Sequence, residues 1–131
     1  MKLAYTTSPG RGDMDLVLAR VAERLEGRGL RVLGVVQINS ACEGDRPCDM
    51  DVKVLPHGPL IRISQSLGPQ SRGCRLDPQG VEQAVGETAA RLAGGGDVLM
   101  VNKFGKQEAE GRGFRDVIAE ALAADMTVVV G

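Results

Sequence analysis

The turn spanning residues 7–16 combines residue types that can bind a phosphate group. It reads Thr-Ser-Pro-Gly-Arg-Gly-Asp-Met-Asp-Leu and follows a short apolar run. In the phosphate-binding pattern G-x-x-x-x-G-K-[ST], backbone N–H groups face the phosphates, the lysine neutralises their charge and the hydroxyl binds Mg²⁺. Gly12 keeps the second glycine position, but Asp13 replaces the lysine and Met14 replaces the hydroxyl residue. We therefore predict a backbone cradle for an anion, with candidate residues Ser8, Gly10, Arg11, Gly12 and Asp13.

A second charged segment follows the apolar run at 97–101. In enzymes that hydrolyse nucleoside triphosphates, the strand at this place ends in an acidic pair that holds magnesium-bound water and polarises the attacking water. Asn102 and Lys103 stand there instead, and neither can act as a carboxylate ligand or a base. Efficient hydrolysis is therefore not predicted, whereas the cations of this segment favour an anionic ligand. The candidate residues are Asn102, Lys103, Lys106, Glu108 and Arg112.

Both segments also have a structural interpretation. The first is also consistent with a Pro-Gly turn in which Asp13 caps the following helix, and on its residues alone this structural interpretation is favoured. The second could be a solvated loop whose cations pair with Glu108 and Glu110 at the surface. Loops at the carboxyl ends of strands converge on the ligand-binding crevice of open α/β sheets, so the functional interpretation is favoured for the second segment.

The three cysteines and the single histidine form a third candidate group. Cys42, Cys48, Cys74 and His57 could supply the ligands of a Cys3His metal site. Their spacing contains no C-x2-C pair, and a free cysteine is more often a buried thiol than a ligand. We therefore predict no metal site and keep these four residues as the candidates for one.

Strand-like and helix-like patterns alternate along the chain and determine where these segments lie. The β-branched run at 31–39 indicates a strand buried on both faces, as in parallel sheets. Asp77-Pro78 combines an N-cap residue with a proline at the first helical position. Strands separated by helices call for a parallel sheet with right-handed crossovers. We predict strands at 3–7, 31–39, 97–102 and 127–130, helices at 16–26, 78–92 and 114–122, a hairpin from 52–55 and 60–63, and an irregular stretch at 64–73.

Composition limits the classes of function. The chain has 131 residues, which suits a single domain spanning residues 1–131, and its formal net charge is −1. With 2% aromatic residues and no basic excess, nucleic-acid binding is not expected. Short apolar runs, no evident signal peptide and an odd number of cysteines predict a cytoplasmic protein without membrane insertion. Because the chain ends directly after a buried strand, we expect that a covering C-terminal helix is missing.

The order of the predicted elements and two motifs resemble the small P-loop nucleoside-triphosphatases of the kinase-like class, the cancer-related NTPase family. Pro9-Gly10-Arg11-Gly12 falls in the frame of the family's phosphate-binding loop, and Gly105, Lys106 and Glu108 match its second motif. The two acidic residues of that motif are absent. The resemblance implies a P-loop NTPase-like three-layer α/β sandwich with a mainly parallel sheet and a hairpin insertion in the middle.

Nearly the whole chain is more closely similar to a bacterial family of degenerate P-loop proteins that are often encoded beside molybdate ABC-transporter genes. Residues 73–77 and 102–113 carry the most specific part of this resemblance. It leaves open whether the protein is an enzyme. Three functions remain: nucleotide binding with weak or no hydrolysis, which ranks slightly ahead, oxyanion binding by a non-catalytic accessory of molybdate handling, and protein interaction on an NTPase scaffold. The expected ligands are a nucleotide with Mg²⁺ or molybdate, and the expected partners are a small anionic ligand, a second copy of the chain or a transporter component.

Overall fold

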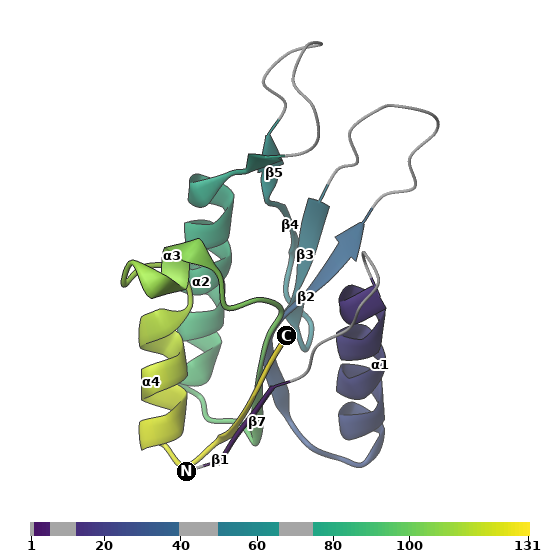
Figure 1. The fold of residues 1–131 in the computed structure, drawn as a ribbon. Coiled ribbons are helices and arrows are strands. Elements are labelled where there is room, and N and C mark those ends of the chain that lie inside the picture. The colour runs from purple at the N-terminus through teal and green to yellow at the C-terminus, as the bar shows by residue number, and fades with distance from the viewer. Residues whose placement is uncertain (1, 6–12, 40–49, 66–74) are drawn as a thin grey trace.

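Six strands form one mixed sheet in the order β1–β8–β7–β2–β3–β4 (Figure 1). The structure is a computed structural model and describes residues 2–5, 13–39, 50–65 and 75–131. β1, β8, β7 and β2 run parallel to one another, and β3 and β4 extend the sheet as antiparallel strands. The bounds are β1 Lys2–Tyr5, β2 Val32–Asn39, β3 Met50–Leu55, β4 Leu60–Arg62, β7 Val98–Val101 and β8 Thr127–Val130.

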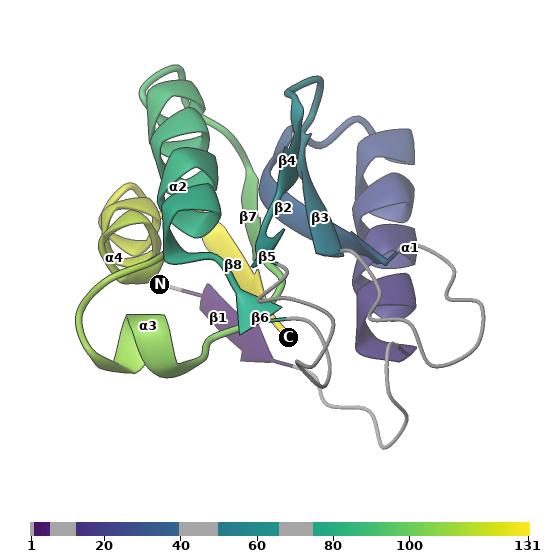
Figure 2. The same cartoon turned by 90° about the horizontal axis from the view of Figure 1, so that it is seen from above.

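Helices cover both faces of this sheet. α1 (Asp13–Gly27) packs on one face, whereas α2 (Pro78–Leu92) and α4 (Arg115–Ala123) lie side by side on the other (Figure 1, Figure 2). Leu33 and Val35 of β2 join the apolar cluster under α2 and α4, and Val32 and Val36 join the cluster under α1. The prediction of an α/β fold whose central strands are buried on both faces is confirmed. None of the described helices is long and apolar enough to cross a membrane.

α2 begins at the predicted residue, and this start fixes one wall of the site described below. Asp77 has an extended backbone, and its side chain accepts a hydrogen bond from the N–H of Gln79 at 3.0 Å. Pro78 follows at the first helical position, where a missing N–H costs no helical hydrogen bond. Gly80 lies directly against the carbonyl oxygen of Arg62, where a Cβ atom would collide. The first turn of α2 is therefore held close to β4.

Two short features differ from the predictions. Residues Ser64–Gln65 form β5, which pairs antiparallel with β6 (Arg75–Leu76), so the prediction of an irregular stretch is wrong at its start. The remainder of that stretch, 66–73, lies outside the described residues. α3 (Lys106–Ala109) is a single helical turn inside the polar segment that follows β7. Elements of two to four residues are too short to show a period of 2 or 3.6 in the sequence.

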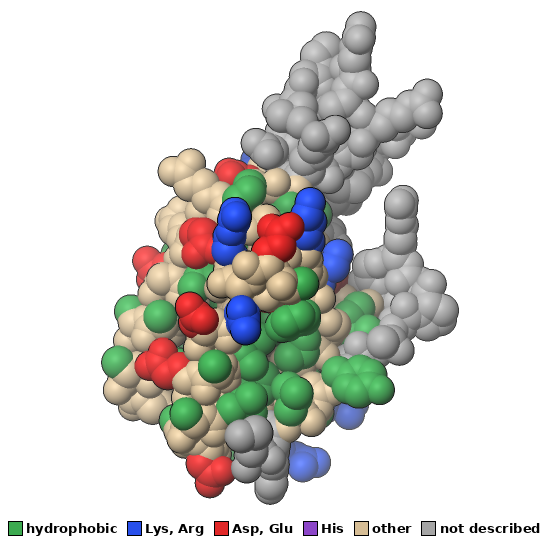
Figure 3. Space-filling view, turned by 60° about the vertical axis from the view of Figure 1, so that its left-hand side comes forward, with side chains coloured by type: hydrophobic (Ala, Val, Ile, Leu, Met, Phe, Trp, Pro, Cys, Tyr) green, Lys and Arg blue, Asp and Glu red, His purple; other side chains and the backbone are tan. Residues whose placement is uncertain are grey.

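β1 lies at the edge of the sheet, and β8 separates it from β7. The two segments predicted to form one site therefore follow strands that are not adjacent. Leu3 and Tyr5 of β1 are 60% and 82% exposed. The space-filling view shows apolar side chains gathered on the face that includes this edge, beside an area where acidic and basic side chains alternate (Figure 3). An exposed apolar edge is the kind of surface that the interaction-module hypothesis requires.

Candidate functional site

A pocket of about 810 Å³ opens where β7 and β2 end. The start of α1 lies on one side of it, and α3 with the segment before it lies on the other. Ligands of open α/β sheets bind outside the carboxyl ends of the strands, so this is the expected place for a ligand. Among the described residues, the polar ones that line it are Asp15, Gln37, Asn102, Lys103, Lys106, Gln107 and Glu108. The apolar residues that line it include Met14, Val35, Met50, Val52, Ile63, Leu76, Val81, Ala84, Phe104 and Phe114.

Asn102 connects three elements at the edge of this pocket. Its side chain is buried, and its Oδ1 accepts a hydrogen bond from the N–H of Gln37 at 3.0 Å. Its Nδ2 donates to Asp15 Oδ1 at 2.7 Å and to Gln37 Oε1 at 3.3 Å. Both amide hydrogens of Asn102 are therefore used inside the protein. Asn102 therefore ties the first turn of α1 to β2 and β7, and its predicted contact with a ligand stays a prediction.

Asp15 explains why an amide stands at the end of β7. A carboxylate at position 102 would lie at hydrogen-bond distance from the Asp15 carboxylate, and two like charges at that distance repel. Asn102 avoids this conflict because its Nδ2 donates to Asp15. The acidic group at this edge of the sheet thus comes from α1. Asp15, the second acidic residue of Asp13-Met14-Asp15, was not among the residues predicted for the site.

Lys103 and Lys106 supply positive charge at the pocket. Both are exposed, and no described side chain forms a salt bridge with Lys103. Lys106 Nζ lies 4.0 Å from Glu110 Oε1, and because both side chains are exposed this contact contributes little. Arg112 is also exposed but is not among the described lining residues. Two of the three cations predicted for the segment after β7 therefore line the pocket.

Glu108, in the same segment as these lysines, is buried. Its carboxylate accepts hydrogen bonds from its own backbone N–H and from that of Gly105, the N-cap residue of α3, in the manner of a capping box. Burial raises the pKa of Glu108 and the nearby Glu82 carboxylate raises it further, while these hydrogen bonds and Lys103 act in the opposite direction. Glu108 therefore holds the turn that presents Lys103 and Lys106.

The raised pKa of Glu108 predicts a pH-dependent effect of Glu108→Gln. When the pKa of a carboxyl is higher in the folded than in the unfolded state, the free energy of unfolding of the protein falls as the pH rises from the lower pKa to the higher one. The reason is that the folded protein resists ionisation of this group. We expect the variant to be more stable than the parent at pH 7.5, and the difference to shrink or reverse at pH 4. Urea unfolding at both pH values measures this, with the exposed Glu110→Gln as the control. An equal difference at both pH values would contradict the assigned cause.

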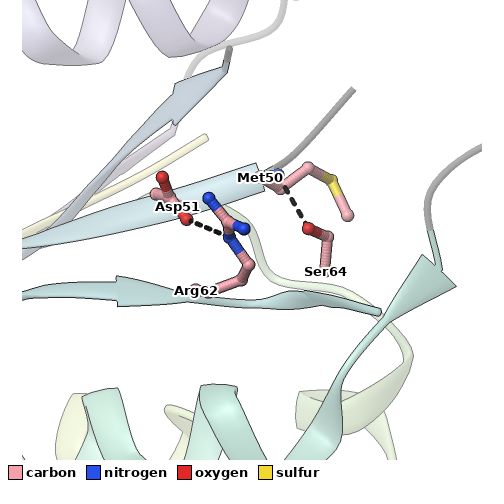
Figure 4. Close-up of polar contacts among 4 residues, drawn as sticks. All are labelled: Met50, Asp51, Arg62 and Ser64. Carbon is pink, nitrogen blue, oxygen red and sulfur yellow. Dashed lines mark hydrogen bonds and ion pairs between the residues drawn. The ribbon is translucent and has the colours of Figure 1, made fainter. Parts of the chain in front are cut away.

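The β3–β4 hairpin presents a preformed wall to the pocket. The N–H of Met50 donates to the Ser64 hydroxyl at 3.0 Å, and Ser64 is itself buried (Figure 4). Arg62 Nε of β4 lies 3.1 Å from Asp51 Oδ1 of β3, whereas Ser64 belongs to β5 (Figure 4). These contacts fix the end of the hairpin from which Met50 and Ile63 line the pocket.

The remaining predicted residues divide into two groups. Ser8, Gly10, Arg11, Gly12, Cys42, Cys48 and Cys74 lie outside the described residues, and the backbone of Asp13 begins α1. His57 is exposed in the turn between β3 and β4, at the opposite end of β3 from the pocket. Within the described ranges, no group of three or more His, Cys, Asp or Glu side chains could hold a metal ion.

Comparisons with known proteins place the chain in a family. Residues 3–131 match the family described as "Protein of unknown function (DUF2478)". The molybdenum import ATP-binding protein ModC 2 of Bradyrhizobium diazoefficiens is 38% identical over 117 residues, which are 89% of this chain and 13% of that relative. The chain thus spans about an eighth of the relative's length. No solved structure gives a significant match. The match along nearly its whole length shows that the chain belongs to the DUF2478 family.

Proposed function

We propose that this protein binds a nucleotide in the pocket at the ends of β7 and β2 and hydrolyses it weakly or not at all. The observation that carries the proposal is the pocket itself, because the first turn of α1 and the segment from Asn102 to Glu108 line the same cavity. The start of a helix favours negative charge, and Lys103 and Lys106 add two exposed cations, while the Asp15 carboxylate in that turn accepts a hydrogen bond from Asn102 and Glu108 is buried. The proposal includes a degenerate phosphate-binding loop before α1.

Weak hydrolysis follows from the groups at the end of β7. Phosphoryl transfer to water needs a residue that positions or polarises the water, and a metal held by carboxylate or hydroxyl groups. Position 102 is an amide whose hydrogens bond to Asp15 and Gln37, and position 103 is a lysine. Neither group is a base. The proposed role is therefore binding, and ATP turnover should be close to the uncatalysed rate.

Oxyanion binding linked to molybdate is the second candidate. It is favoured by the similarity to part of a molybdenum import ATP-binding protein, although the match covers 13% of that protein. The size of the pocket argues for the nucleotide, because 810 Å³ is within the range of cavities that take organic ligands of drug size. A single tetraoxyanion would occupy a small part of it.

The two lysines provide the test. We expect calorimetric titration to show ATP binding, and the double variant Lys103→Gln/Lys106→Gln to weaken it about tenfold or more, because charge-assisted hydrogen bonds are the strong ones. Lys53→Gln is the matched control, since Lys53 is exposed on β3 and is not among the described lining residues. The ATP titration is carried out with and without Mg²⁺, and separate titrations use molybdate, sulfate and phosphate as ligands. Absence of ATP binding at millimolar concentration would reject the proposal, and selective binding of molybdate would establish the second candidate.

A further inference from the structure

The pocket has two chemically different halves. Its outer half carries Lys103, Lys106 and the amide of Gln107. Its inner half is made by buried apolar side chains that belong to the core cluster under α2: Val35, Val52, Ile63, Val81 and Ala84. An inorganic anion gains nothing from contact with such a wall, whereas a ligand with an apolar body gains from removing that body from water.

Phe104 lies between the two lysines in the sequence and lines the same pocket as the apolar residues. It follows Lys103, precedes the N-cap residue Gly105 of α3, and lines the pocket. Its side chain remains 49% exposed, although it is one of only two phenylalanines in the chain. Phe114, the other phenylalanine, is buried and lines the same pocket. A half-exposed aromatic ring at the edge of an apolar cavity is suited to stack on a flat ring that enters the cavity.

We infer that the inner half of the pocket binds a planar heteroaromatic ring, stacked on Phe104, while the anionic group attached to that ring binds at Lys103 and Lys106. The inference rests on the proposed function and specifies it, because it makes the ring of the nucleotide a source of affinity. The wall is preformed on one side by the Met50–Ser64 hydrogen bond and on another by the first turns of α2 against β4. Little ordering of these walls is therefore needed when the ring enters.

The test compares ATP with inorganic triphosphate, which carries the same type of charge without a ring. We expect the parent protein to bind ATP about tenfold more tightly than inorganic triphosphate, as stacking of one base on one aromatic side chain allows. Phe104→Ala should bring the two affinities close together, because it should weaken the binding of ATP and leave the binding of inorganic triphosphate unchanged. Tyr5→Ala is the matched control, because Tyr5 is an exposed aromatic residue on β1 that is not among the described lining residues.

The possible failures are distinguishable. Equal affinities of the parent for ATP and inorganic triphosphate would overturn the inference and leave the proposed function standing. An equal loss of both affinities in Phe104→Ala would also overturn it, because the residue would then act on the phosphates. If neither ligand bound to the parent, both proposals would be rejected. The comparison of the two ligands on the parent protein needs no variant, so it decides the inference even if Phe104→Ala does not fold.

Discussion

Gly34→Ala is expected to lower the free energy of unfolding by about 3 kcal/mol or more. Gly34 lies within β2 with φ +107°, in the region that residues with a side chain rarely adopt. A Cβ atom at this position would collide with the backbone of Met100 in the neighbouring strand β7. Met100 is completely buried between the sheet and α1, so β7 has no free space into which it could withdraw.

Urea unfolding of Gly34→Ala measures this effect, and Gly86→Ala is its matched control. Gly86 lies in the middle of α2, and an added Cβ would meet nothing within 4 Å. Alanine is the better helix former by about 1 kcal/mol, so Gly86→Ala should raise the stability. The same substitution should thus have opposite signs at the two sites. Equal free energies of unfolding for the two variants would show that β2 and β7 can move apart at this point without loss of stability.

Elements with a strong local pattern could be predicted almost to the residue. The strand at 127–130 and the helix at 78–92 have the predicted bounds, because a β-branched run and an Asp-Pro cap are local signals. α3 could not be predicted in this way, since its single turn depends on Glu108 reaching back to Gly105 and on burial of that carboxylate. The edge position of β1 is likewise a property of the whole sheet.

Several of the predicted site residues line one pocket, whereas the roles predicted for them remain predictions. Asn102 and Glu108 line the pocket, but both have hydrogen-bond partners inside the protein. Asp15 went undetected because an acidic residue in the first turn of a helix is usually interpreted as a favourable interaction with the helix dipole. Its partner Asn102 is 87 positions away in the sequence. The apolar half of the pocket was not predicted, because the sequence around Val35 and Val52 shows the same strand pattern whether these side chains face a core or a cavity.

Asn102→Asp is expected to lower the free energy of unfolding by about 3 kcal/mol at pH 7.5. The new carboxylate would lie where Nδ2 now donates to Asp15 Oδ1 at 2.7 Å, so a hydrogen bond becomes a repulsion between two carboxylates. The contact with Gln37 Oε1 would also lose its donor. Because proximity raises the pKa of one carboxyl of such a pair, lowering the pH to 4 should protonate it and restore part of the lost stability.

The second change Asp15→Asn should recover most of this loss, because it exchanges the amide and the carboxylate without changing the size of either side chain. The asparagine at 15 can donate to the aspartate at 102, while the N–H of Gln37 still donates to an oxygen at that position. The four proteins of this double-mutant cycle, unfolded in urea at pH 7.5, give the coupling between the two positions. We expect Asp15→Asn alone to be mildly destabilising and the coupling to exceed about 2 kcal/mol. Additive effects would mean that Asn102 is required for contacts other than that with Asp15, and the amide at the end of β7 would then need a different explanation.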